Sequence, residues 1–477
     1  MKESDLKSRK ETPEQELKRL RKENAKLKSQ KEAGKAELRR LKKDLKKRRA
    51  EDNDIRRTAQ VSFDPVPGHR FSIQLIMLCV LIYVRTGCGL RTVVSILGIF
   101  EDVLGESFGK APCYNTVRNW VLKLGLSVYE QDTPLPSKYG VIIDESIMIN
   151  KEKLLLALGF DADKTDGPLS HRDVVVLGMK VGESFKRSDV DDELSRISGS
   201  VGHAPEYGIS DGAHNLAGGF KDAGIPHHLD ISHTLGNCMK HAYGDDAEFK
   251  ALTEKLGKIR LQYHLTDKAW LLPPNMRAIA RFMNLQDWVE WAERMLGCYD
   301  TLEDSMKEAF SFLLSYRELI GELAISVGAI RHVERICKND GFSRRTSAVC
   351  QSHIIKHVVG NANNRRASLG LEMVDYFRRQ EELLEKAGDI HHISSDIIES
   401  DFGIFKAKKS PNKLYGITSL VLMLPLYPKV AEYSDTETQD FKVRLANIKL
   451  KEVDLWAREN LSPNRVALRS KTLKKVI

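Results

Sequence analysis

The sequence predicts a multi-domain chain that combines all-α parts with one α/β part. Leucines recur every seven residues near the N-terminus, which is typical of a coiled coil. Between residues 138 and 243, Val- and Ile-rich runs alternate with helical stretches, and this alternation predicts a sheet covered by helices. A long helical segment then precedes a late helix that carries acidic residues. The 477 residues are enough for roughly two to four domains.

Residues 1–60 predict a basic coiled coil. In a heptad frame, the a positions hold Leu17, Asn24, Lys31, Leu38 and Leu45, and the d positions hold Leu20, Leu27, Gly34, Leu41 and Arg48. Leucines at a and d favour a zipper-like seam, and the Asn favours one register and a dimer. A solvated, charged helix without a partner stays open as the alternative. The segment holds 22 Lys and Arg against 12 Asp and Glu, which indicates a polyanion partner.

Residues 68–130 predict a helix-turn-helix domain that binds DNA. Apolar helical patterns cover 71–85 and 89–104, and a third helix begins after Pro112. Val117, Trp120 and Val121 of that helix are expected to face the core. The residues near its start that suit bases or phosphates are Asn115, Thr116, Arg118 and Asn119. A three-helix core without a DNA role is the alternative, and the basic N-terminal segment favours DNA binding.

Three acidic residues stand where a fold can bring them together. Asp144 ends the apolar run 140–144, Asp211 ends the apolar run 207–211, and Glu399 lies in a stretch with helical spacing. A carboxylate at the end of a buried strand is held rigidly at a sheet edge. Two such strands and a helix can therefore place three carboxylates around one or two Mg²⁺ ions, an arrangement that suits phosphodiester chemistry. Glu145 is left out because side chains alternate along a strand.

The order of elements around these acids is three strands, helix, strand, helix, strand, helix. This order resembles the RNase H-like fold of the DDE transposases, of the prokaryotic insertion-sequence type with a helical insertion before the Glu. The resemblance implies a catalytic domain at 138–243 and 388–410. It also implies that Asp144, Asp211 and Glu399 are the catalytic residues and the ligands of two Mg²⁺ ions, with Mn²⁺ as a substitute.

A further resemblance surrounds the third acid. Some cut-and-paste transposases carry a Tyr, an Arg and a Lys at fixed spacing around this Glu. Glu399 and Lys406 match the Glu and the Lys, whereas His392 and Ser395 stand in the Tyr and Arg places. Seven residues are about two helical turns, so Glu399 and Lys406 share one helix face. The resemblance implies that Lys406 holds a DNA phosphate beside the metals.

The remaining segments predict helices. Residues 244–387 are a predicted helical insertion, because 187 residues separate Asp211 from Glu399, more than the fold needs. Its tryptophans, Trp270, Trp288 and Trp291, are either core residues or stack on a displaced base. Its basic pairs, Arg344-Arg345 and Arg365-Arg366, either hold DNA or form a solvated surface. Residues 411–477 predict a helical, basic tail.

Composition limits the compartment and the partners. Seven cysteines without a C-x-x-C pair argue against a disulfide framework and a Cys-rich zinc site, and favour a reducing cytoplasm. The longest apolar run, 75–84, is far shorter than the ~20 residues of a membrane span. We therefore expect a prokaryotic, nucleoid-associated cytoplasmic protein with no membrane partner. Its expected partners are double-stranded DNA, both transposon ends and target, and further copies of itself, at least as a dimer.

These features together predict a DNA transposase. Such an enzyme cuts transposon ends and joins the 3′-OH ends to target DNA by two-metal-ion chemistry. One alternative is an RNase H-like DNA nuclease without strand transfer. Another is a catalytically inactive, domesticated DNA-binding protein, against which the intact set of three acids argues.

Overall fold

The chain forms two compact units in the computed structural model, Met1–Pro65 and Val66–Ile477. The described residues are 13–58, 65–104, 110–130, 135–149, 152–274, 282, 285–360, 363–408, 416–431, 433, 435–463 and 465–476.

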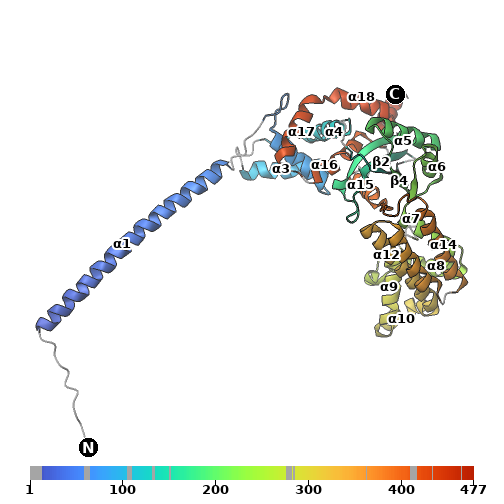
Figure 1. Cartoon of the computed structure of the whole chain (residues 1–477), viewed down its shortest axis with the longest axis horizontal. Coiled ribbons are helices and arrows are strands. Elements are labelled where there is room, and N and C mark those ends of the chain that lie inside the picture. Colours follow the sequence, from blue (N-terminus) through green and yellow to red (C-terminus); the bar gives the residue numbers. More distant parts are fainter. Residues whose placement is uncertain are drawn as a thin grey trace, which may run out of the picture. The chain divides into compact units, whose positions relative to one another are not determined.

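The first unit contains one long helix, α1, Pro13–Thr58 (Figure 1). Strong helix formers (Ala, Leu, Glu, Lys and Arg) make up most of it, which explains its length. Its heptad leucines are 51–60% exposed; we call them the leucine stripe, and they are Leu17, Leu20, Leu27, Leu38, Leu41 and Leu45. The helix is as expected, and its pairing with another helix stays a prediction.

The second unit contains a five-stranded mixed sheet. Its strands are β1 (Tyr139–Ile149), β2 (Glu152–Asp161), β3 (Val174–Gly182), β4 (Tyr207–Ser210) and β5 (His227–Leu229). The strand order across the sheet is β3-β2-β1-β4-β5. The first three strands form an antiparallel meander, and β4 and β5 run parallel to β1. The predicted order of strands and helices is therefore confirmed, with α5 (Arg187–Val201), α6 (His214–Asp222) and α7 (Ile231–Tyr243) in the expected places.

The two faces of the sheet belong to different cores. Val141 and Ile143 of β1 pack with α5 and α6 on one face. Ile142 points to the other face, where it shares a core with Ile398 of α15 (Asp396–Ala407). This alternation follows from the pleat of a strand, in which successive side chains point to opposite sides. It decides which carboxylates of β1 can reach α15.

The N-terminal helices of this unit pack on the α15 side of the sheet. They are α2 (Ile73–Arg85), α3 (Leu90–Leu104) and α4 (Tyr114–Glu130). Val117, Trp120 and Val121 are buried as expected, and Trp120 Nε1 donates to His69 Nδ1 at 3.1 Å. A buried indole requires such a partner because its N–H loses water on folding.

The C-terminal segment completes the same core. Its helices are a 3₁₀ turn (Ser419–Met423), α16 (Leu426–Ala431), α17 (Asp435–Asn447), α18 (Leu450–Asn460) and α19 (Arg465–Val476). α17 and α18 pack directly on α4. Val421, Leu422, Phe441 and Trp456 are buried in the core that holds α2–α4 and α15. The helical character expected of this segment is confirmed, and its apolar face belongs to the core of the second unit.

The residues between α7 and α15 form a helical region with its own core. Its helices are α8 (Ala247–Tyr263), α9 (Leu285–Cys298), α10 (Asp304–Phe310), α11 (Phe312–Ser315), α12 (Arg317–Asp340), α13 (Arg344–Ile354) and α14 (Asn364–Glu381). Trp288 is buried in this core, Trp291 donates to the Leu271 carbonyl at 2.9 Å, and Trp270 is 79% exposed.

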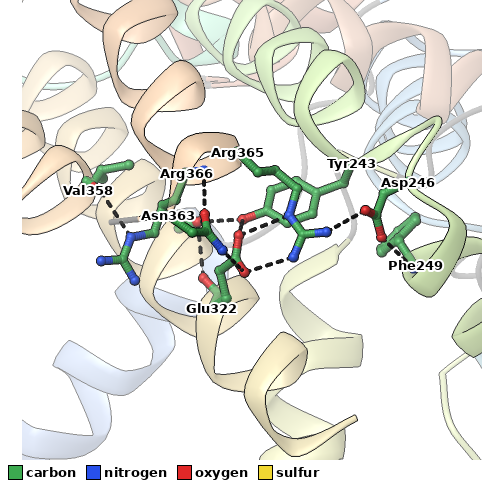
Figure 2. Close-up of polar contacts among 9 residues, drawn as sticks. Tyr243, Asp246, Phe249, Glu322, Val358, Asn363, Arg365 and Arg366 are labelled. Atoms are coloured by element: carbon green, nitrogen blue, oxygen red, sulfur yellow. Dashed lines mark hydrogen bonds and ion pairs between the residues drawn. The ribbon is translucent and has the colours of Figure 1, made fainter. Parts of the chain in front are cut away.

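A polar cluster, the Glu322 network, joins α7 to α8, α12 and α14 (Figure 2). Glu322 of α12 accepts hydrogen bonds from Tyr243 Oη (2.9 Å), Asn363 Nδ2 (2.8 Å) and Arg365 Nη2 (2.8 Å). Arg365 also lies 2.5 Å from Asp246, which caps the start of α8. The network fixes the end of α7 and the starts of α8 and α14 to α12.

A candidate active site of three carboxylates

Strand register places two of the predicted acids side by side. In the parallel pair of β1 and β4, Ile142 lies opposite Ile209. Two residues further on stand Asp144, within β1, and Asp211, directly after the end of β4, so the same register brings them to adjacent positions. Neighbouring strands are about 4.8 Å apart, and the two carboxylates are therefore close.

The turn after Asp211 depends on a glycine. Gly212 has φ +79°, and a Cβ there would lie 2.9 Å from Leu229 Cδ2. Because only glycine adopts this conformation without strain, the chain leaves the sheet sharply at this point. The carboxylate of Asp211 then accepts a hydrogen bond from the amide of Ala213 at 2.8 Å, which fixes it at the start of α6.

The two neighbouring acids of β1 have different surroundings. Asp144 shares the face of Ile142, on which α15 packs, and its Oδ1 accepts a hydrogen bond from the Glu145 amide at 2.6 Å. Glu145 points to the opposite face, where it pairs with Lys153 at 2.5 Å and accepts a hydrogen bond from Asn215 of α6. Glu145 therefore lies on the face opposite to Asp144, as the alternation along the strand predicts.

Glu399 reaches the same edge of the sheet from α15. The start of α15 is held by Asp230, a fully buried carboxylate that accepts from the amide and hydroxyl of Ser395 at 2.6 and 2.9 Å. Asp230 also accepts from the His233 amide at 2.7 Å, which caps α7. One carboxylate thus fixes the first turns of both helices. Ile397 and Ile398 are buried beneath the sheet, which leaves Glu399 on the outer face of α15.

The pKa of Asp144 reflects the presence of the other two acids. Burial raises the pKa of Asp144 to about 7, and the negative charges of Asp211 and Glu399 add to the increase. Carboxylates that share a site and lack a matching cation ionise with difficulty. The fold therefore brings together Asp144, Asp211 and Glu399, which lie 67 to 255 residues apart in the sequence.

His233 belongs to the site and was not predicted from the sequence. Its Nε2 lies 2.7 Å from Glu399 Oε1. The hydrogen bond to Glu399 raises the pKa of His233 to about 9, and the charges of Asp230 and Asp211 contribute. The imidazolium is thus the cation that Glu399 contacts. A lone His after a short strand gives no signal in the sequence, because its partner is 166 residues away.

Two lysines lie at the edge of the site. Partial burial lowers the pKa of Lys406, and the charges of Asp144 and Glu399 oppose that change, so the ammonium group is near both acids. The shared face of Glu399 and Lys406 agrees with their spacing on α15. Lys338 of α12 pairs with Asp396 at 2.7 Å and donates to Ser232 at 2.9 Å. The helical region therefore contacts the starts of α7 and α15 directly beside the site.

The predicted DNA-binding residues on α4 are less accessible than expected. Asn115 is exposed, whereas Thr116, Arg118 and Asn119 are partly buried. Arg118 Nη2 donates to Ser419 Oγ in the C-terminal segment at 3.0 Å. From Trp120 to Val128 the helix is buried. Only the first turn of α4 is thus open to a ligand, and a DNA contact by Arg118 requires that it leave Ser419.

The chemistry of the donors fits a divalent metal ion. Carboxylate oxygens are the ligands that Mg²⁺ prefers, and a dication would offset the crowded negative charge around Asp144. Among the described residues, no group of three or more His, Cys, Asp or Glu side chains is placed to hold a metal ion. At this site the carboxylate of Glu399 is hydrogen-bonded to His233. Glu399 has to exchange that bond to join Asp144 and Asp211 as a ligand.

No protein-family model matches the chain, and no curated protein matches it either. Across the described part of the chain, none of the helices is long and apolar enough to cross a membrane.

Proposed function

We propose that this chain is a DNA transposase of the DDE class with an RNase H-like catalytic domain. In this proposal it cuts the ends of a transposon and joins the freed 3′-OH ends to target DNA. Asp144, Asp211 and Glu399 hold two Mg²⁺ ions, for which Mn²⁺ substitutes. The protein works in the cytoplasm of a prokaryote, on the nucleoid, as at least a dimer.

One observation carries the proposal: three carboxylates from separate elements meet at one sheet edge beside only two cations, His233 and Lys406. Structural carboxylates are normally paired, because an unpaired buried charge costs several kcal/mol. A protein that keeps three acids together, one of them with a pKa raised to about 7, is arranged for a positive ligand. The sheet order and the late acidic helix support the family resemblance noted above.

The residues have separate roles in this mechanism. Bound metal ions would activate the attacking water or 3′-OH and stabilise the leaving oxygen. Asp144 and Asp211 provide a rigid pair of ligands, because each is fixed by a backbone amide at a strand end. Glu399 would be the third ligand and would give up its hydrogen bond to His233 to hold the metals. Lys406 binds the phosphate of the DNA strand beside the acids, where its charge compensates the nonbridging oxygens.

DNA binding is assigned to two regions. The first two turns of α4, with Asn115, Thr116, Arg118 and Asn119, would contact the transposon end once Arg118 leaves Ser419. The basic residues of α1 would bind phosphates without regard to sequence, in a manner that weakens as salt increases. Double-stranded DNA is thus the substrate and the main partner.

The test is a reaction of the purified full-length chain with linear DNA that carries the inverted repeats flanking its coding region. We expect cleavage at the repeat ends and joining to a target plasmid, both dependent on Mg²⁺ or Mn²⁺. Asp144→Asn should abolish both reactions. Glu145→Gln is the matched control, since it removes the adjacent carboxylate on the opposite face and should leave the chemistry intact.

The outcomes separate the alternatives. Cleavage without joining would assign the chain to RNase H-like nucleases. DNA binding without metal-dependent cleavage would assign it to inactive, domesticated DNA-binding proteins. Equal loss of activity in Asp144→Asn and Glu145→Gln would remove the support for this active site.

A further inference from the structure

The leucine stripe of α1 is flanked by two rows of charge with opposite sign. In the heptad frame used above, the g positions hold Glu16, Glu23, Gln30, Glu37 and Asp44. The e positions hold Arg21, Lys28, Lys35, Lys42 and Arg49. Four of five g residues are thus acidic, and every e residue is basic. Residues at e and g border the seam of a coiled coil and set the orientation of its helices.

A parallel pair of α1 helices in register matches these charges. In that arrangement each g residue meets the e residue five positions later on the partner helix. The contacts are Glu16 with Arg21, Glu23 with Lys28, Gln30 with Lys35, Glu37 with Lys42, and Asp44 with Arg49, each formed twice by symmetry. Four of the five pairs join opposite charges. Lys35, which meets the neutral Gln30, has a partner on its own helix, Glu32 at 2.8 Å.

An antiparallel pair has the opposite consequence. Its g positions face g positions and its e positions face e positions, so acids meet acids and bases meet bases. Alignment of the two seams would also bury Asn24 against Leu41, whereas a parallel pair places Asn24 beside Asn24, where the amides can bond each other. Like-charge contacts and an unpartnered amide both exclude the wrong orientation.

The middle of the seam opposes pairing in any arrangement. In the parallel pair Lys31 meets Lys31, and Gly34 has no side chain to fill its place in the seam. A Lys at one a position is tolerated because its long stem lies along the seam while the ammonium group reaches water. One like-charge contact stands against four attractive pairs formed twice, so the charge balance favours the parallel dimer.

We propose that α1 pairs with α1 of a second copy as a parallel, in-register, two-stranded coiled coil. The occupant of the leucine stripe is therefore the same stripe of another chain. Both copies of residues 66–477 then attach to the same end of the coiled coil. The orientation rests on the dimer included in the proposed function, but it is independent of metal ions and of DNA.

Disulfide crosslinking of the full-length chain tests the orientation. Leu20 occupies a d position and Leu45 an a position, roughly 38 Å apart along the helix. We expect Leu20→Cys to crosslink with itself, and Leu45→Cys likewise, far above the background of the unmodified chain and its seven cysteines. A mixture of the two variants should give almost no mixed crosslink. Mixed crosslinks without self-crosslinks would overturn the proposal in favour of antiparallel helices.

Charge reversal tests the partner, with sedimentation measured in the absence of DNA and metal. Changing Glu16, Glu23, Glu37 and Asp44 to Lys should raise the dimer dissociation constant more than about 100-fold, because eight attractive contacts become repulsive. Changing Arg21, Lys28, Lys42 and Arg49 to Glu should do the same. Mixing the two variants should restore dimers. The matched control changes Lys18, Lys22, Arg40 and Lys43, at outer positions, to Glu and should keep the dimer.

These results are separate from those for catalysis. A chain that stays monomeric in unmodified form, or a dimer that is insensitive to both reversals, would overturn the coiled coil and leave the carboxylate site untouched. A parallel dimer that does not cleave DNA would overturn the carboxylate site and leave the coiled coil untouched.

Discussion

Two clusters in the second unit are built around carboxylates, and they differ in how charge is matched. In the Glu322 network, Glu322 contacts Arg365, Asn363 and Tyr243, and Arg365 contacts a second acid, Asp246 (Figure 2). At the sheet edge, Asp144 has Asp211 and Glu399 as neighbours. In the first cluster, both acids contact the guanidinium group of Arg365. The second contains more negative charge than its surroundings balance.

The pKa values show the same contrast. Burial opposes ionisation of Glu322, yet hydrogen bonds from Arg365, Asn363 and Tyr243 outweigh it and lower the pKa. For Asp144, burial and the neighbouring acids act in the same direction and raise the pKa to about 7. Matched carboxylates therefore stabilise the fold, whereas unmatched ones reduce stability and are kept for a ligand. The two shifts have opposite signs because donors outweigh burial at Glu322, whereas neighbouring acids add to burial at Asp144.

The largest expected effect is on catalysis. Asp211→Asn and Glu399→Gln should each reduce DNA cleavage roughly 10³-fold or more, because ligands of a shared site act as a unit. Asp211→Asn should leave the free energy of unfolding unchanged or higher, since it removes repulsion from Asp144, whereas Glu399→Gln also loses the ion pair with His233 and should lower it. Cleavage assays and denaturant titration of each variant give both numbers. DNA binding should survive in both. A variant that cleaves well would contradict the assignment of its residue.

The Glu322 network should respond in the opposite way. Glu322→Gln leaves Arg365 without its main partner and should lower the free energy of unfolding by about 2–4 kcal/mol, somewhat less than for a fully buried pair. The side chains of Glu322 and Arg365 are 10% and 21% exposed, which justifies the reduction. Below the unfolding transition, cleavage should be unaffected. Arg379→Gln, which removes the exposed ion pair of Arg379 with Asp375, is the control. It should lower the free energy of unfolding by less than about 1 kcal/mol. Equal losses of unfolding free energy in the two variants would show that Glu322 contributes no more than an exposed ion pair.

The sequence predicted the sheet edge well and the Glu322 network not at all. Asp144 and Asp211 follow apolar runs, and a strand end fixes a carboxylate, so local pattern was sufficient. Arg365 was expected on a solvated or DNA-binding surface. Its partner Glu322 is 43 residues away, and no local pattern joins them.

The same limit explains two other differences. His233 was missed because its contact with Glu399 spans 166 residues. Arg118 was expected to face DNA, and its bond to Ser419 spans 301 residues. Helical periodicity predicts which face of α4 is buried but not which distant segment covers it.

A third cluster, of neutral histidines, extends the comparison to pH. His228 is fully buried between Gln380 and His391, at 2.8 Å from each. Burial lowers the pKa of His228 to about 3 and that of His391 to about 4. Unfolded histidines take up protons near pH 6.5, so the unfolded state binds more protons as the pH falls below that value. These two neutral histidines therefore make their full contribution to the free energy of unfolding above pH 6.5. That contribution is lost progressively as the pH falls toward 4.

We expect each of these histidines to contribute roughly 1–2 kcal/mol of destabilisation between pH 7 and pH 5. Denaturant titrations at the two pH values measure this loss, and His391→Gln should reduce it. His264→Gln, at an exposed helix end, is the control and should leave the slope unchanged. An unchanged slope in His391→Gln would mean that this cluster stays neutral in both states.

The smallest effect compares two lysines at the end of α15. Lys406 lies near Asp144 and Glu399. Lys408 donates to the carbonyl oxygen of Cys88 at 2.8 Å, and to the Tyr83 and Thr86 carbonyls, so it satisfies the end of α2. Both are cations near the end of α15, Lys406 more exposed than Lys408, and they differ in what they contact. Lys406→Met should lower cleavage about tenfold, because a phosphate contact is lost while all three carboxylates remain.

Lys408→Met should instead lower the free energy of unfolding by about 1–3 kcal/mol, because the carbonyl groups at the end of α2 lose a charged donor. Its cleavage per folded molecule should match that of the unmodified chain. Cleavage rates at saturating DNA, together with denaturant titrations, separate the two effects. If Lys406→Met destabilises the chain and leaves cleavage unchanged, Lys406 compensates the carboxylates structurally. The sheet edge would then contain a matched cluster like that of Glu322, and the contrast between the two regions would no longer support a metal site.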